Sequence, residues 1–155
     1  METILQVFLT LAFCQGVLLI IPPIVIKTTN DFWLRGATAR NNPLFIWIDH
    51  HQVYYEAVLA QEVYECEARK WLYNLFKWYV SFDYKREVEL MGQAIEIVIA
   101  VNGMQSKSAK AYLQKQAWIL STKYKQFSGY TQHQIEGMLY KSLPKAEMWV
   151  KENVK

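Results

Sequence analysis

The stretch "YYEAVLAQEVYECEARKWLYNLFKWYVSF", residues 54–82, decides the fold. Its apolar side chains recur at helical spacing, at Val58, Leu59, Val63 and Cys66 and on through Leu72, Leu75 and Phe76. This spacing predicts one long helix over the stretch. The same helix carries Glu62, Glu65 and Glu67, so several carboxylates lie within a segment that reads as core.

Short β-branched segments precede this helix. "IVIKTT", residues 24–29, predicts a strand, and "LFIWIDHH", residues 44–51, predicts a second one because its side chains alternate. Between them, "DFWLRGATARNNP", residues 31–43, predicts a turn-rich connection or a short helix that ends near Gly36.

Further helices follow the long one. Residues 83–102 predict a helix with Asp83 as N-cap, and Asn102-Gly103 marks its end. Ser106 or Ser108 begins the next helix, which ends near Ser128-Gly129; Thr131 caps another, and Pro144 separates a last short helix. The predicted fold class is α+β and mainly helical, with short amino-terminal strands followed by a bundle of four to five helices.

Composition limits the function classes. The chain has 155 residues, of which 52% are hydrophobic and 15% aromatic. This excess predicts a well-filled core or a surface that meets a membrane or a partner. A net charge of +3 is too small to indicate nucleic-acid binding by itself. Cys14 and Cys66 form neither a disulfide framework nor a metal-knuckle spacing.

The amino-terminal segment is apolar. "ILQVFLTLAFCQGVLLII", residues 4–21, has no charged residue and stops at Pro22-Pro23. We expect residues 1–21 to form an apolar helix that contacts a membrane or other protein subunits, and residues 22–155 to form a single domain. Glu2 precedes the run without any Lys or Arg, which disfavours a cleaved signal peptide. Positive charges after the run predict a cytoplasmic body.

Two segments together resemble a known family. "FIWIDHHQVYYEAVLAQEVYE", residues 45–65, and "YKREVELMGQA", residues 84–94, resemble the small zincin-like metallopeptidase domains, including compact forms encoded by tailed bacteriophages. In that family a strand, an Asp and a short loop precede "LAHExxH" on the active helix. A Glu on the next helix, within an "ExEA"-like stretch, completes the metal site. The resemblance covers residues 22–100 and implies a zincin-like core and a phage origin.

The resemblance also implies a role for individual residues. Two ligands at positions i and i+4 of a helix lie on one face and can hold one metal ion. By position, Gln61 and Glu65 take the places of the two histidines, and Glu62 takes the place of the general base. Glu87 is the first candidate for the third ligand and Glu89 is the substitute.

Both motif histidines are therefore replaced. An amide and carboxylate set suits Mg²⁺, Ca²⁺ or Mn²⁺ better than Zn²⁺. We favour a degenerate scaffold without a cofactor that serves as a structural or interaction protein, such as a virion or membrane-associated component. The alternative is an active metal-dependent hydrolase that uses the Gln/Glu ligand set. Without a metal, Arg69 is expected to join a network with the glutamates, because it follows Glu65 by four residues.

Other patterns indicate weaker hypotheses. Asp49-His50-His51 resembles one motif of the DHH phosphoesterases, but the further Asp-rich motifs of that family are missing upstream. A turn of polar residues at the end of the strand is the simpler interpretation, and a third possibility is that His50 or His51 helps the glutamates bind a metal. Two of the glutamates could also act as the acid and base of a glycosidase, although no substrate-cleft pattern accompanies them.

Basic residues on the helix spanning residues 107–125 suit contact with nucleic acid or acidic lipid, and an ordinary lysine-bearing helix face is the simpler interpretation. These residues are Lys107, Lys110, Lys115, Lys123 and Lys125. The predicted location is membrane-associated or virion-associated, and otherwise the host cytoplasm.

Overall fold

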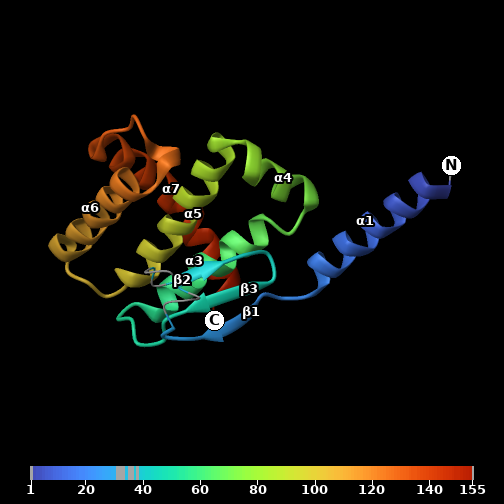
Figure 1. The fold of residues 1–155 in the computed structure, drawn as a ribbon. Coiled ribbons are helices and arrows are strands. Elements are labelled where there is room, and N and C mark those ends of the chain that lie inside the picture. Colours follow the sequence, from blue (N-terminus) through green and yellow to red (C-terminus); the bar gives the residue numbers. More distant parts are fainter. Residues whose placement is uncertain (1, 31–33, 35–36, 38, 155) are drawn as a thin grey trace.

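The computed structural model describes residues 2–30, 34, 37 and 39–154. Helices make up most of the molecule, and a small sheet lies against one side of the helical body (Figure 1). The predicted class, mainly helical α+β with short amino-terminal strands, is confirmed.

The sheet has three strands in the order β1-β3-β2. The strands are β1 (Ile24–Lys27), β2 (Ala39–Asn41) and β3 (Phe45–Ile48), with β1 parallel and β2 antiparallel to β3. Both predicted strands are present, and β2 is an additional strand within the segment that predicted turns. The short helix expected to end near Gly36 falls largely outside the described residues.

The central strand fastens the sheet to the helices. Ile46 and Ile48 are fully buried and pack with Val58 and Cys66 of the first helix after the sheet. The Cys66 thiol donates to the carbonyl oxygen of Asn42 at 2.9 Å, and burial raises the pKa of this thiol to about 12. Cys66 is therefore a buried apolar residue rather than a reactive thiol.

The single long helix predicted over residues 54–82 is wrong. The chain forms α3 (Tyr55–Ala68) and α4 (Leu72–Val80), and Trp71 between them is extended with ψ 129°. The Tyr84 hydroxyl donates to the carbonyl oxygen of Ala68 at 2.7 Å and so satisfies a backbone group at the end of α3. No Gly or Pro marks the break, so helical periodicity runs across it without a signal.

The remaining helices build the main core around α5. They are α5 (Phe82–Ala100), α6 (Ser106–Lys123), the 3-10 turn η1 (Lys125–Phe127) and α7 (Gln132–Asn153). Helix α5 packs against α3 on one side and against α7 on another. The largest fully buried side chains of this core are Phe127, Ile95, Leu120, Ile135 and Leu139.

Helix ends correct several sequence predictions. Ser81, and not Asp83, caps α5, because its hydroxyl accepts from the Tyr84 amide at 3.2 Å. Gln105 precedes α6 without a side-chain cap, so neither Ser106 nor Ser108 is the N-cap. The expected cap at Thr131 is confirmed, and it forms a capping box with Gln134.

Pro144 does not end a helix, contrary to the prediction. Helix α7 runs through it to Asn153. A proline inside a helix removes one backbone hydrogen bond. The neighbouring Leu143 and Ala146 pack into the core, and Ala146 is fully buried, so tertiary packing offsets that loss.

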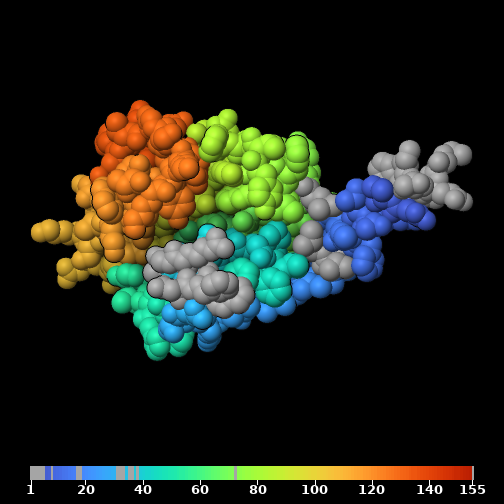
Figure 2. All heavy atoms as spheres, in the orientation of Figure 1, coloured from blue at the N-terminus to red at the C-terminus, as the bar shows by residue number. Residues whose placement is uncertain are grey.

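The apolar amino-terminal helix α1 (Glu2–Ile20) is present and extends away from the body (Figures 1 and 2). Near its base, Gln15 Nε2 donates to the carbonyl oxygen of Lys70 at 3.1 Å. Pro22 and Pro23 lie between this helix and β1.

Candidate functional site

Buried polar side chains gather where α3, α5 and α6 face one another. Each is exposed by 3–8% only. They are Gln61, Glu62 and Glu65 from α3, Glu89, Gln93 and Glu96 from α5, and Gln116 from α6. We call these seven residues the polar cluster. Four carboxyl groups in one interior are unusual, because a buried charge is costly unless it is paired.

Gly92 lets the helices approach closely enough to form this cluster. A Cβ atom on Gly92 would lie 2.9 Å from Glu65 Oε1 and 3.1 Å from Gln61 Cγ. The side chains of Gln61 and Glu65 therefore occupy the space that any other residue at position 92 would need. Glycine here is explained by close packing of two helices.

Amide groups satisfy the carboxylates on α3. Gln61 Nε2 donates to Glu65 Oε1 at 2.9 Å, and Asn41 Nδ2 donates to Glu65 Oε2 at 3.0 Å. The same Asn41 nitrogen also donates to Glu62 Oε2. Strand β2 thus contributes one amide that joins two neighbouring carboxyl groups of α3.

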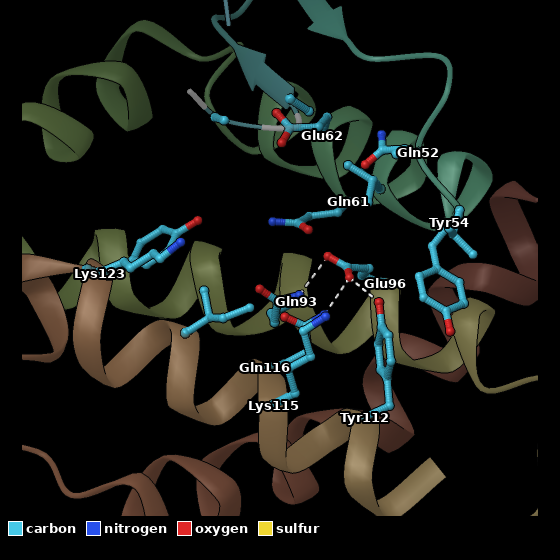
Figure 3. Close-up of a pocket in the computed structure, with 16 residues that line it drawn as sticks. Gln52, Tyr54, Gln61, Glu62, Gln93, Glu96, Tyr112, Lys115, Gln116 and Lys123 are labelled. Atoms are coloured by element: carbon cyan, nitrogen blue, oxygen red, sulfur yellow. Dashed lines mark hydrogen bonds between the residues drawn. The ribbon is translucent and has the colours of Figure 1, made fainter. Parts of the chain in front are cut away.

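Glu96 accepts hydrogen bonds from three side chains (Figure 3). Gln116 Nε2 and the Tyr112 hydroxyl donate to Glu96 Oε1, the former at 2.7 Å, and Gln93 Nε2 donates to Glu96 Oε2 at 2.7 Å. Hydrogen bonds to a carboxylate, called charge-assisted hydrogen bonds, are among the stronger ones in proteins. They tie α6 to α5 through a polar contact.

The pKa values of the carboxyl groups in the polar cluster are raised, so these groups bind a proton more readily than exposed glutamates do. Burial, and next the Glu65 carboxylate, raise the pKa of Glu62 well above its usual range. Burial likewise raises the pKa of Glu65 and of Glu96, while their hydrogen-bond donors act in the opposite direction. The cause is desolvation of charge together with repulsion between like charges.

Arg69 supplies charge to the cluster but forms no ion pair with it. Its Nε donates to the backbone oxygen of Glu65 at 2.8 Å, and its guanidinium group stacks on Trp78 at 4.5 Å. Among the described residues, the salt bridges join Lys70 to Glu67 and Arg86 to Asp83. The network expected between glutamates and Arg69 is instead a network of amides and carboxyl groups.

The two candidates for a third ligand differ in position. Glu87 is exposed, and its carboxylate raises the pKa of Tyr84 only after the effect of burial. Glu89 is 8% exposed, and burial, then the Glu65 and Glu62 carboxylates, raise its pKa well above the usual range. Glu89, and not Glu87, is therefore the residue of this pair that is buried with Glu62 and Glu65 in the polar cluster, and the ligand roles stay a prediction.

The histidines lie apart from this arrangement. His50 and His51 are exposed in the turn after β3, with their ring centroids 4.0 Å apart. Asp49 accepts from the His51 amide at 2.9 Å, which is a local turn contact.

The residues at the motif positions do not fit a zinc ion. Within the described part of the chain, no three His, Cys, Asp or Glu side chains are placed to hold a metal ion. Glu65 uses both oxygens to accept amide hydrogens from Gln61 and Asn41, and the Asn41 nitrogen lies between the two carboxyl groups. Hydrogen donors therefore take the positions that a cation would need.

A cavity of about 570 Å³ opens beside the cluster (Figure 3). Residues from α3, α5, α6 and the segment before α3 line it. The polar ones are Gln52, Tyr54, Gln61, Glu62, Gln93, Glu96, Tyr112, Lys115, Gln116, Lys123 and Tyr124. Of the five lysines noted in the sequence, Lys115 and Lys123 reach this cavity, and both are exposed at its edge.

Sequence reasoning missed Asn41, Gln93, Glu96 and Gln116. A signal for part of this set exists, because Glu89, Gln93 and Glu96 recur at helical spacing and so lie on one face of α5. Asn41 and Gln116 come from other elements, and only the tertiary structure brings them to the cluster.

An apolar surface forms a second candidate site. On α1 the exposed large side chains include Val7, Leu9, Leu11, Phe13 and Ile20, and on and beside α4 they are Trp71, Tyr73, Phe76, Tyr79, Val80 and Phe82. We call these residues the apolar surface; the α4 part of it was not predicted. Phe13 is 73% exposed and Tyr79 is 73% exposed, so both present most of their rings to the surroundings. Within the described residues, no helix has both the length and the apolar character to span a membrane.

Comparisons with protein-family models, with curated proteins and with solved structures found no match for this chain. The zincin-like resemblance therefore stays a proposal that depends on the residues quoted above.

Proposed function

We propose that this protein is a non-catalytic, membrane-associated interaction protein built on a zincin-like scaffold. The observation that carries the proposal is the apolar surface of α1 and α4. A helix that is apolar on all sides is normally enclosed by a protein core or by lipid. Here α1 extends from the body with Leu9 62% exposed and Phe13 73% exposed.

The composition of α4 favours a lipid surface as the partner. Trp71, Tyr73 and Tyr79 are exposed beside Phe76, and Lys77 lies 4.7 Å from the Tyr73 ring. Trp, Tyr and Lys side chains next to an apolar helix are typical of the membrane–water interface. Gln15 joins the base of α1 to the segment before α4, so both apolar elements belong to one end of the molecule.

The polar cluster supports the non-catalytic part of the proposal. Gln61 and Glu65, at the positions of the family's histidines, are hydrogen-bonded to each other. Glu62, at the general-base position, shares the Asn41 amide with Glu65. These hydrogen bonds occupy both oxygens of Glu65 and one oxygen of Glu62, which suits a role in holding α3 and β2 together.

Flotation with phospholipid vesicles tests the proposal. We expect the full chain to float with vesicles, and the double variant Leu11→Glu/Phe13→Glu to remain in the unbound fraction. Met148→Glu is the matched control, because Met148 is also exposed (62%) but lies on α7.

Two other results would contradict the proposal. If the full chain stays unbound and instead forms a defined oligomer in light scattering, the partner is another protein subunit, as in a virion component. Stoichiometric metal in the purified protein that is lost in Glu65→Ala would contradict the non-catalytic assignment.

A further inference from the structure

The cavity beside the polar cluster has the size of a ligand site. Its volume of about 570 Å³ falls within the range usual for small-molecule pockets. Three of its lining amides belong to side chains that are at least nine-tenths buried: Gln61 is 6% exposed, Gln93 is 3% exposed and Gln116 is 6% exposed. Figure 3 shows these side chains reaching into the space between α3 and the α5–α6 pair.

The amide nitrogens of these three residues are already used. Gln61 donates to Glu65, and Gln93 and Gln116 donate to Glu96. Their carbonyl oxygens remain, and none of these oxygens accepts a hydrogen bond from the described residues. The deep wall of the cavity therefore presents acceptors.

Glu62 adds a carboxyl group to this wall, and a bound cation would favour its ionised form. Asn41 donates to its Oε2, and no described residue donates to its Oε1. No described Lys or Arg pairs with its carboxylate, as the salt bridges above show. None of these oxygens is among the buried side-chain atoms without a hydrogen-bond partner in the described part of the chain, which are Gln52 Nε2 and Arg69 Nη2, so they are open to the cavity. A bound group that supplies several hydrogens and a positive charge can therefore reach them directly.

The edge of the cavity has the opposite character. Lys115 and Lys123 are exposed there, whereas Gln52 Nε2, a donor without an acceptor among the described residues, is buried in the cavity wall. The cavity thus has an acceptor-lined interior and a donor-lined edge.

We propose that this cavity binds a small organic cation. Its ammonium or guanidinium group contacts Glu62 and carbonyl oxygens of the Gln61, Gln93 and Gln116 set, and an acceptor at its other end faces one of the two lysines, Lys115 or Lys123. A divalent metal fits less well, because no three acidic, His or Cys side chains of the described chain converge on one point. The inference does not depend on the attachment of α1 to a membrane.

Calorimetric titration of the full chain tests the proposal with three matched probes. We expect 5-aminopentanoate to bind with a Kd below about 1 mM. Pentylamine, which lacks the carboxylate, is expected to bind more weakly, and pentanoate, which lacks the ammonium, is expected not to bind. A blocked lysine, with acetyl and methylamide ends, represents the same cation on a protein side chain. If 5-aminopentanoate binds more tightly than the blocked lysine, the natural ligand is a free amine. If the blocked lysine binds more tightly, the ligand is a basic side chain of another protein.

Variants locate the binding. Glu62→Gln keeps the shape of the side chain and removes its charge, so we expect its Kd to rise at least about tenfold. Glu87→Gln, an exposed position on α5, is the control and should bind as the unchanged protein does. Glu96→Gln, which also lines the cavity, serves if Glu62→Gln does not fold.

Several results would overturn the proposal. They are the failure of all three amines to bind at a concentration about ten times that Kd, binding of pentanoate as tight as that of the amines, and unchanged binding in both Glu62→Gln and Glu96→Gln. Stoichiometric binding of Mg²⁺ or Ca²⁺ that excludes the amines would assign the cavity to a metal instead.

Discussion

The polar cluster and helix α1 reverse the usual arrangement of a folded protein. Four glutamates are buried between α3, α5 and α6, whereas Phe13 on α1 is 73% exposed. Globular proteins normally bury apolar side chains and expose charged ones. The difference teaches that the two regions depend on different contacts: most cluster carboxyl oxygens accept hydrogen bonds from within the chain, whereas the exposed side chains of α1 are those that the proposed partner would cover.

The largest expected effect comes from comparing a phenylalanine of the apolar core with one on α1. Phe127 is fully buried, so Phe127→Ala should lower the free energy of unfolding by about 3–5 kcal/mol. Phe13→Ala should change it by less than about 0.5 kcal/mol, since the ring is exposed. Urea denaturation of the two variants checks this. Equal losses would mean that α1 packs on the body as a core helix does.

A glycine pair tests the close approach of helices inside the cluster. In Gly92→Ala the new Cβ would meet Glu65 Oε1 and the Cγ atoms of Gln61 and Glu65, which their hydrogen bonds hold in place. We expect a loss of about 1–3 kcal/mol.

The control for this change is Gly137→Ala on α7, where no atom lies within 4 Å of the added Cβ. The higher helix propensity of alanine should stabilise that variant by roughly 0.5–1 kcal/mol. Thermal unfolding of both variants gives the comparison, and a stabilised Gly92→Ala would show that the cluster can move aside.

The variants Glu89→Gln and Glu87→Gln test whether the buried carboxyl group of Glu89 has a raised pKa. Because burial raises the pKa of Glu89, the folded protein holds a proton that the unfolded chain releases above the usual glutamate pKa. The stabilising contribution is therefore complete below that usual pKa, about 4.3, and is lost as the pH rises through the folded value. We expect Glu89→Gln to raise stability at pH 8 by roughly 1–2 kcal/mol and to have a smaller effect at pH 5.

Glu87→Gln is the control for this pair, because Glu87 is exposed two residues earlier on α5. Its effect should be within about 0.5 kcal/mol at either pH. Melting temperatures of both variants at pH 5 and pH 8 test this prediction. A Glu89→Gln variant whose gain is the same at both pH values would contradict a raised carboxyl pKa.

The smallest effect concerns the two thiols, one on α1 and one on α3, the helix that carries part of the polar cluster. Cys14 on α1 is exposed, whereas Cys66 is buried and burial raises its pKa to about 12. At pH 8 a thiol reagent should label Cys14 quickly and Cys66 only after denaturation. Mass spectrometry of the labelled chain checks this, and added vesicles should protect Cys14 if α1 enters lipid.

The sequence predicted the helical class, two strands, and a helix that buries glutamates, because these depend on periodicity and local propensity. It did not predict the break between Ala68 and Leu72, since no Gly or Pro marks it and Tyr84 satisfies the end of α3 from a distance. It also ranked Glu87 before Glu89, because position in a motif cannot distinguish two faces of α5. Asn41 and Gln116 join the site only through tertiary contacts.

The two prolines after α1 have a mechanical consequence. Proline restricts φ to one narrow range, so Pro22 and Pro23 form a stiff connection of little length. The strand that follows is paired in register with β3, from Ile24 opposite Phe45 to Lys27 opposite Ile48. A lipid surface or subunit that binds α1 would therefore keep the folded body close to it, because only this short connection separates the two.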